Sequence, residues 1–455
     1  MIKATALKIL FVQQNYLYFG SHFGFNLNLA KLLVEEDGHE VHMLVPIRDE
    51  NHKIADKNVE VQLNVQYFMP KTQVAPSLIG VNVPLEYDQI YFDIASDLEL
   101  IDKLRSEKFD VGITETYYLT GYSLAIFHFL EIPVTIATHS QPMAPFHLYL
   151  LGVLSKMKTE MHNYIGLPTL NFLPSGEDRL ELLNFKSLEV REEQLKLRRH
   201  KDVAYQTLAE EKYALNTFPS WVEMFRSTRF FFLNSLPEVD FAQFKIVKNI
   251  EKTNSLINLT LGTKEGVILV SFGTVVDTLF RTSSHIIEAL VETMESFSNY
   301  LFIWKQPKGD LPILKEFKLE NVVLQNWINQ KEILAHPKTM AFVSHCGMNS
   351  VMESTFYGVP MVCMPFFGDQ YYNAELLAIQ KIGLVIETKN DKHTIQKELN
   401  LALSTALGLI KSSEEHFDLD KLKSVSMGIR QKKIAKTISD AMKTIEKEIN
   451  ERKRQ

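Results

Sequence analysis

One short segment combines residue types that bind phosphate groups in many proteins. The apolar run Ala341-Phe342-Val343 leads into Ser344-His345-Cys346-Gly347-Met348-Asn349-Ser350, and Glu353 follows one helical turn after Asn349. A strand that ends here and opens a helix presents backbone N–H groups and the positive end of the helix dipole, which suit phosphate. Gly347 would let the backbone approach an anion, and Glu353 could accept both hydroxyls of a ribose. Taken alone, the segment also fits an ordinary helix N-cap beside a buried histidine.

Residues on both sides of this segment favour a nucleotide sugar as the ligand. Trp327, with Gln330 three residues later, offers an aromatic face for a base and an amide for its edge. Asp369 and Gln370 follow the apolar run 361–364 and place a carboxylate beside an amide, a pair that suits a neutral sugar. The loop Ser271-Phe272-Gly273-Thr274 could give further donors to a diphosphate.

These motifs resemble those of the UDP-glycosyltransferase family, whose members are inverting enzymes that conjugate small lipophilic acceptors. The pattern W-x-x-Q, HCGxNS, E and DQ matches at every position expected to contact the donor. The resemblance implies that Trp327 and Gln330 hold uracil, Glu353 holds ribose, and Asp369 with Gln370 holds the sugar. For the diphosphate it implies His345, Asn349, Ser350 and Thr274, and the candidate donor site is completed by Ser271, Gly273 and Gly347.

The first half of the chain carries a candidate catalytic pair. His22 lies in a segment that resembles the family's S-H loop, at the start of the first helix. An acceptor hydroxyl is a poor nucleophile until a base removes its proton, and a neutral imidazole can do so near pH 7. The resulting imidazolium needs a carboxylate beside it, usually an Asp in the family, and this sequence has Glu115 at the matching place. The alternative is an exposed helix-start histidine and a solvated loop acid.

Short apolar runs that alternate with helical patterns predict the elements that position these residues. Such runs are typical of parallel strands buried on both faces of a sheet. The expected strands are 7–13, 39–45, 110–114, 133–137 and 229–234 in the first half, and 267–271, 300–304, 322–325, 341–344, 361–364 and 384–387 in the second. The predicted fold class is α/β, and the resemblance implies the GT-B fold, with two Rossmann-like domains facing a cleft.

We expect four regions along the chain. Residues 1–240 form an acceptor-binding domain, in which about 141–227 is a helical insertion that contributes either to an acceptor pocket or to an extra helical layer. Residues 241–265 form a linker, and residues 266–424 form the UDP-sugar-binding domain. The helical run 425–455 is too polar for a core helix and is expected to lie over the domain junction.

Composition excludes several classes of protein. The net charge of −6 over 455 residues argues against a nucleic-acid partner. The only cysteines, Cys346 and Cys363, lie in apolar strand-like sequence, so we expect no disulfide framework and a reduced compartment. There is no metal-ligand spacing and no apolar window of about 20 residues, and we expect the first 12 residues to form a strand rather than a signal peptide. The expectation is a soluble cytoplasmic protein, unless the sequence is a trimmed form of a membrane-anchored one.

The expected reaction is inverting transfer of a hexosyl group from a UDP-sugar to a hydroxyl of a small lipophilic or phenolic acceptor. His22 is the expected base, and neither a metal nor another cofactor is needed. Glucose is favoured over glucuronate because no basic residue is assigned to a uronate carboxylate. Two alternatives stay open: a non-catalytic nucleotide-sugar-binding or regulatory protein, and a transferase with a lipid-linked or polymeric acceptor.

Overall fold

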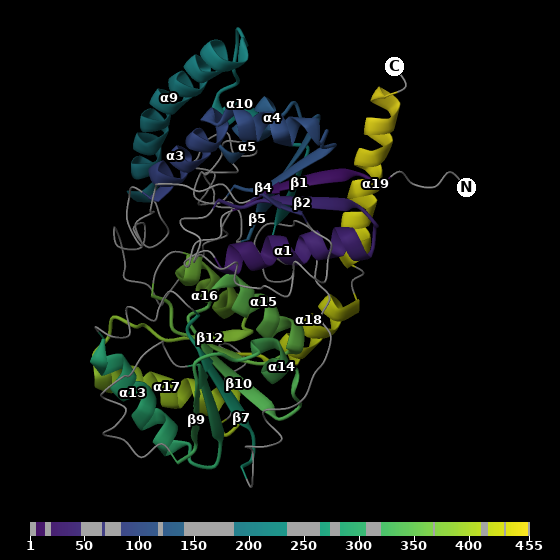
Figure 1. The fold of residues 1–455 in the computed structure, drawn as a ribbon. Helices are drawn as coiled ribbons and strands as arrows, with labels where there is room; N and C mark the ends of the chain where they lie inside the picture. Colours follow the sequence, from purple (N-terminus) through teal and green to yellow (C-terminus); the bar gives the residue numbers. More distant parts are fainter. Residues whose placement is uncertain are drawn as a thin grey trace. The chain divides into compact units, whose positions relative to one another are not determined.

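Two six-stranded parallel sheets, one in each half of the chain, organise the computed structural model (Figure 1). The structure describes residues 6–13, 20–46, 66–68, 83–116, 122–140, 186–233, 264–273, 283–305, 320–366, 369–410, 417–431 and 434–453. The first unit comprises Met1–Asn234, Phe244–Lys248 and Ile434–Gln455, and the second comprises Ser235–Gln243 and Asn249–Lys433. The expectation of an α/β fold with two parallel sheets is confirmed.

The sheet of the first unit has the strand order β3-β2-β1-β4-β5-β6. Its strands are β1 (Lys8–Val12), β2 (Glu40–Leu44), β3 (Gln66–Phe68), β4 (Val111–Glu115), β5 (Val134–His139) and β6 (Phe230–Leu233). All neighbouring strands are parallel, and the register places Glu115 opposite Thr138. The carboxyl ends of β4 and β5 therefore meet at one edge of the sheet, where parallel sheets bind ligands.

Helices bury both faces of this sheet. One core packs around α3 (Val83–Ser96), α4 (Leu98–Ser106), α5 (Ser123–Phe129), α9 (Lys186–Tyr213) and α10 (Trp221–Ser227). The other packs around α1 (Gly20–Glu35) and α19 (Ile434–Arg452). Strand β1 contributes Leu10 and Val12 to the first core and Ile9 and Phe11 to the second, because successive strand side chains point to opposite faces.

The predicted helical insertion falls only partly on described residues. Residues 141–185 lie outside them, whereas α9 and α10 occupy most of the remainder. Tyr205 and Trp221 from these two helices are buried in the core that also contains α3 and α5. This part of the segment therefore forms a helical layer on the sheet, and the pocket-forming role of the insertion stays a prediction.

The sheet of the second unit has the order β12-β11-β10-β7-β8-β9. Its strands are β7 (Val267–Ser271), β8 (Leu301–Lys305), β9 (Val322–Gln325), β10 (Thr339–Ser344), β11 (Met361–Cys363) and β12 (Gly383–Val385). Helices α13 (Ser284–Ser296) and α17 (Lys392–Ala406) pack in one core. The other core contains α14 (Gln330–Ala335), α15 (Met348–Tyr357), α16 (Asp369–Ile379) and α18 (Leu419–Gln431).

The end of the chain differs from the expectation of a single helix too polar for a core. Two helices, α18 and α19, occupy this region, and they belong to different units. In α19, Ile438, Met442, Ile445 and Ile449 are buried together with residues of β1 and α1. Their spacing of four, three and four places them on one helical face, so the low mean hydropathy hid an amphipathic core helix.

Among the described residues, no helix is long and apolar enough to cross a membrane. The same residues contain no group of three or more His, Cys, Asp or Glu side chains that could hold a metal ion.

Candidate functional site

In the first unit, the end of β4 brings Glu115 next to His22 of α1. His22 Nδ1 lies 3.5 Å from Glu115 Oε1, and both side chains are almost completely buried. Asn26, one helical turn after His22, donates from Nδ2 to Glu115 Oε2 at 3.0 Å and to the His22 carbonyl at 3.2 Å. The two predicted catalytic residues are therefore adjacent, and neither is the solvated side chain of the alternative interpretation.

Ser140, the residue after β5, joins the same cluster. Its backbone N–H donates to Glu115 Oε1 at 2.9 Å, and its hydroxyl lies 3.3 Å from the same oxygen. The Ser140 hydroxyl also makes a short hydrogen bond with His22 Nδ1. On the other side of the carboxylate, Thr138 Oγ1 donates to Glu115 Oε2 at 3.4 Å. Sequence reasoning missed Ser140. Its only local signal is that a polar residue follows an apolar strand.

The surroundings of Glu115 keep its carboxyl group ionised. Burial by itself would raise the pKa, but the interaction with His22, the charge of His139 and the Ser140 N–H outweigh it, so the pKa of Glu115 is lowered. An ionised carboxylate beside an imidazole stabilises the imidazolium form. The cluster therefore has the chemistry of a general base with an acidic partner.

In the second unit, the predicted phosphate-binding segment forms the turn from β10 into α15. Gly347 is the N-cap of α15 and no side chain caps the helix, so Asn349 and Ser350 are not the ordinary N-cap of the alternative interpretation. Ser350 and Glu353 are buried in the first turns of this helix. The turn presents the N-terminal end of a ten-residue helix, which favours an anion.

The ring of His345 packs against the backbone of two glycines, Gly273 and Gly347, and leaves no room for a side chain at either position. A Cβ atom added at Gly273 or Gly347 would lie 2.9 or 2.6 Å from His345 Nε2, closer than van der Waals contact allows. Gly273 also has a φ angle of +75°, a conformation that favours glycine. Burial lowers the pKa of His345 to about 4, and the Lys305 ammonium acts in the same direction. The imidazole is therefore neutral near pH 7 and able to donate one N–H.

Gln330 connects the expected base-binding and ribose-binding positions. Its Nε2 donates to Glu353 Oε2 at 2.8 Å and to Ser350 Oγ at 3.2 Å. Lys331 Nζ lies 3.9 Å from Glu353 Oε1. The side chain of Trp327 is 76% exposed, which leaves its ring accessible to a flat ligand.

Lys305 is a cation at this site that sequence reasoning missed. It ends β8, and its Nζ donates to the Gly273 carbonyl at 3.1 Å and lies 5.5 Å from the centre of the Trp327 ring. A lysine that follows an apolar strand on the same sheet edge as Ser271 was a usable signal. Its position brings a positive charge to the loop expected to hold the diphosphate.

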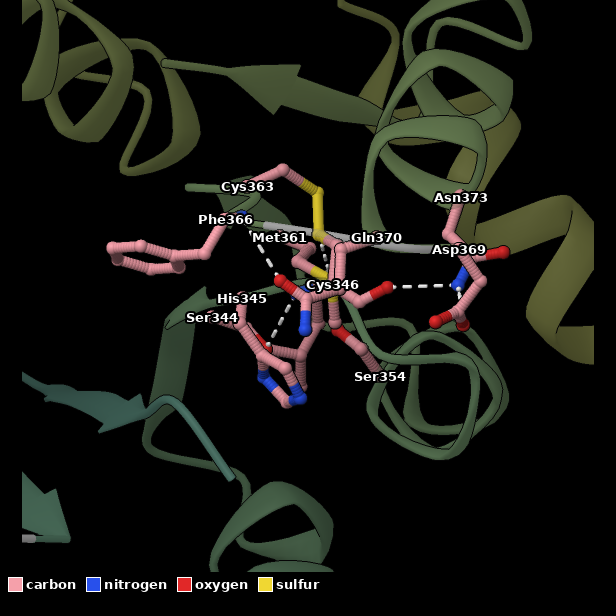
Figure 2. Close-up of a disulfide and its surroundings, with 11 residues drawn as sticks. Ser344, His345, Cys346, Ser354, Met361, Cys363, Phe366, Asp369, Gln370 and Asn373 are labelled. Carbon is pink, nitrogen blue, oxygen red and sulfur yellow. Dashed lines mark hydrogen bonds between the residues drawn. A yellow bond between two sulfur atoms is a disulfide. The ribbon is translucent and has the colours of Figure 1, made fainter. Parts of the chain in front are cut away.

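Asp369 and Gln370 begin α16 and are tied to the phosphate-binding turn through Asn373 (Figure 2). Asn373 Nδ2 donates to Asp369 Oδ2 at 2.7 Å and to the Cys346 carbonyl at 2.9 Å. Gln370 Oε1 accepts from the Phe366 N–H at 2.9 Å. The structure thus brings the expected sugar-binding pair next to the segment that carries His345.

Cys346 and Cys363 form a disulfide, so the expectation of unpaired cysteines is wrong (Figure 2). The bond joins the phosphate-binding turn to the end of β11, and both residues are buried. Apolar sequence around each cysteine concealed the pairing, because β10 and β11 become neighbours only in the sheet. Disulfides are typical of oxidising compartments, so the cysteines no longer support a cytoplasmic location, which stays a prediction.

One residue of the predicted donor site, Thr274, lies outside the described residues. Ser271, at the end of β7, is buried and paired in register with Ser344. The described donor-site residues of the second unit lie at or after the carboxyl ends of β7, β8, β9 and β10 and in the adjoining α14, α15 and α16.

Residues 222–408 match the family model described as UDP-glucoronosyl and UDP-glucosyl transferase. This segment of the chain, less than half of its length, is similar to that family. The matched segment contains every predicted donor-site residue, but neither His22 nor Glu115. The family model therefore covers the donor half, and the catalytic pair depends on the geometry described above.

Proteins with similar sequences come from plants, an animal and a virus. Anthocyanidin 3-O-glucosyltransferase 2 of Fragaria ananassa is 40% identical over 161 residues, which is 33% of this chain and 32% of the relative. Putative UDP-glucuronosyltransferase ugt-48 of Caenorhabditis elegans is 28% identical over 324 residues, 66% of this chain and 57% of the relative. An ecdysteroid UDP-glucosyltransferase of Autographa californica nuclear polyhedrosis virus is 36% identical over 137 residues, 30% of this chain and 26% of the relative. The match therefore spans less than two thirds of each relative.

Solved structures share the fold over almost the whole chain. A UDP-glucosyltransferase from Polygonum tinctorium superposes with a TM-score of 0.66 and 14% identity, covering 98% of this chain and 99% of that one. The glycotransferase of kitacinnamycin gives a TM-score of 0.65 and 16% identity, with coverage of 97% and 99%. At this identity the likeness establishes the GT-B fold alone.

Proposed function

We propose that this protein is an inverting UDP-glycosyltransferase that transfers glucose to a hydroxyl of a small phenolic or lipophilic acceptor. The observation that carries the proposal is the buried contact between His22 and the ionised Glu115 in the first unit. A protein that only binds nucleotide sugars has no need of a buried base with a carboxylate partner. The match of the donor half to a family of UDP-sugar transferases supports a UDP-sugar as the second substrate.

The proposed reaction is a single displacement at the anomeric carbon. His22 takes the acceptor proton on Nε2 while the acceptor oxygen forms its bond to carbon, and the bond to the diphosphate breaks with its electron pair leaving on UDP. Glu115 stabilises the imidazolium that forms. Attack opposite the leaving group inverts the configuration. The start of α15 and the Lys305 ammonium offer positive potential to the departing diphosphate, so the proposal includes no metal.

Glucose and a phenolic acceptor are the preferred substrates. Asp369 and Gln370 match a neutral sugar, and the Fragaria relative is named as a glucosyltransferase of anthocyanidins, which are phenols. The Caenorhabditis relative carries a glucuronosyltransferase name, so glucuronate is the alternative sugar. Incubation with UDP-glucose or UDP-glucuronate and a mixed phenol library, followed by mass analysis of products, separates the two.

The base is tested with His22→Ala. We expect turnover to fall by about 100-fold or more, because a positioned base contributes about this much, while UDP still raises the melting temperature. His200→Ala is the matched control, since His200 is an exposed histidine of α9 in the same unit. Near-normal turnover of His22→Ala would overturn the proposed base. Wild-type protein that binds UDP but neither consumes UDP-glucose nor forms a product would instead be a binding protein.

A further inference from the structure

We propose that Ser140 is a positioning residue that links the His22 imidazole to Glu115, so that the base works through a histidine–serine–glutamate chain rather than a direct histidine–acid pair. The inference rests on the proposed function, because it assigns a role to a neighbour of the proposed base. All three residues belong to the first unit. The observation behind it is the Ser140 hydroxyl, which contacts both His22 Nδ1 and Glu115 Oε1.

The carboxylate of Glu115 is held away from the imidazole by other donors. The Ser140 N–H holds Oε1 at 2.9 Å, and Asn26 Nδ2 holds Oε2 at 3.0 Å. The remaining separation of 3.5 Å between His22 Nδ1 and Glu115 Oε1 exceeds the usual N–H···O range of about 2.7–3.2 Å. The Ser140 hydroxyl, which hydrogen-bonds to Nδ1, is therefore a nearer partner of the imidazole than the carboxylate is.

A hydroxyl is suited to fill this gap because it donates and accepts at once. Ser140 Oγ can accept from Nδ1–H of His22 and donate its own hydrogen to Glu115 Oε1. This arrangement selects the tautomer that carries the proton on Nδ1 and leaves the Nε2 lone pair for the acceptor proton. During the reaction one proton moves, from the acceptor oxygen to Nε2. The Nδ1 proton and the serine proton stay where they are.

Removal of the hydroxyl gives the first test. Ser140→Ala keeps the backbone N–H that holds Glu115, so it deletes only the bridge. We expect kcat with UDP-glucose and a phenolic acceptor to fall about 10- to 100-fold, with KM values within about twofold of wild type. Ser140→Thr keeps a hydroxyl and should recover most of the lost kcat. Ser140→Cys keeps the side-chain volume but hydrogen-bonds weakly, and should resemble Ser140→Ala.

The matched control is Thr116→Val, which removes another buried hydroxyl at the same edge of the sheet. Thr116 is buried, and its Oγ1 donates to the Thr138 carbonyl at 3.4 Å, so its hydroxyl bonds to the backbone of β5. We expect its kcat to stay within about twofold of wild type. Melting temperatures of all variants show whether a loss of kcat reflects a loss of folded protein.

Coupling between Ser140 and Glu115 gives the second test. If the hydroxyl acts through the carboxylate, the double variant Ser140→Ala/Glu115→Gln should have a kcat within about twofold of Glu115→Gln alone. If the two residues act independently, the effects on kcat will multiply. Multiplying effects, or a Ser140→Thr protein no more active than Ser140→Ala, would overturn the bridge.

The outcomes separate this inference from the proposed function. Full activity of Ser140→Ala together with an inactive His22→Ala leaves the base intact and refutes only the serine bridge, because His22 and Glu115 would then form a direct pair. Full activity of His22→Ala refutes the proposed base, and the bridge with it.

Discussion

At the scale of single residues, His345 makes the pH dependence of stability predictable. The folded protein holds this imidazole with a pKa of about 4, whereas the unfolded chain has the ordinary value of 6.5. As pH falls below 6.5 the unfolded state binds a proton that the folded state does not, so the free energy of unfolding decreases down to about pH 4. The pKa difference corresponds to at most about 3 kcal/mol, and the partial exposure of the residue reduces it.

His345→Gln isolates this contribution from those of other groups. Between pH 7 and pH 5 we expect the wild type to lose about 1–2 kcal/mol more of its free energy of unfolding than the variant does. Urea unfolding followed by circular dichroism at both pH values measures the difference. If both proteins lose the same free energy of unfolding between these pH values, the pKa of His345 does not differ between the folded and unfolded states.

The sequence identified residues whose motif is local and missed those whose partners are distant in the chain. His345, Gly347 and Glu353 lie within nine positions of one another, so their spacing alone indicated a phosphate site. Ser140 and Lys305 carry no local motif. They reach their sites because β5 pairs with β4 and β8 pairs with β7, and strand order cannot be read from composition or periodicity.

At the scale of elements, Gly112 sets the distance between β4 and α5. A Cβ atom at this position would lie 2.6 Å from the ring of Phe127, which is completely buried. Gly112→Ala should therefore push α5 from the sheet and lower the free energy of unfolding by about 1–3 kcal/mol, measured by thermal unfolding.

Gly24→Ala in α1 is the control for the Gly112 variant. No atom lies within 4 Å of a Cβ built at Gly24, and alanine is the better helix former by about 1 kcal/mol. This substitution should leave stability unchanged or raise it slightly. An unaltered melting temperature of Gly112→Ala would mean that Phe127 moves aside at little cost.

Strands were more predictable than the helices that cover them. Apolar runs placed β1, β4, β7 and β10 within two residues of their observed bounds, since strands buried on both faces leave a continuous signal. Strand β3 (Gln66–Phe68) is too short to give such a run, and it was not predicted. The buried face of α19 was missed because its four apolar residues are outnumbered by charged ones on the same helix.

At the scale of the whole molecule, the first unit draws part of its core from residues 434–452. Ile445 is completely buried in α19 and shares a core with Ile9 and Leu33. Ile445→Ala should destabilise the first unit by about 2–5 kcal/mol, the usual cost of such a cavity. Hydrogen exchange followed by mass spectrometry should show faster exchange in β1 and β4, with little change in β7 and β10.

Lys443→Ala provides the comparison for this truncation. Lys443 lies on the exposed face of the same helix, and its loss should change stability by less than about 0.5 kcal/mol. Equal acceleration of exchange in both sheets after Ile445→Ala would mean that the two units unfold as one cooperative body.

The position of α19 in the chain also fixes the order of events during synthesis. A ribosome delivers β1 and α1 first, yet the side chains that close their core arrive only with α19, after every strand of both sheets. The sheet of the second unit and its helices α13 to α17 are complete in sequence by residue 406, so this sheet can form earlier. Until α19 has been made, the apolar face that it covers lacks its partner, and we expect chaperones to act on the nascent first unit during this period.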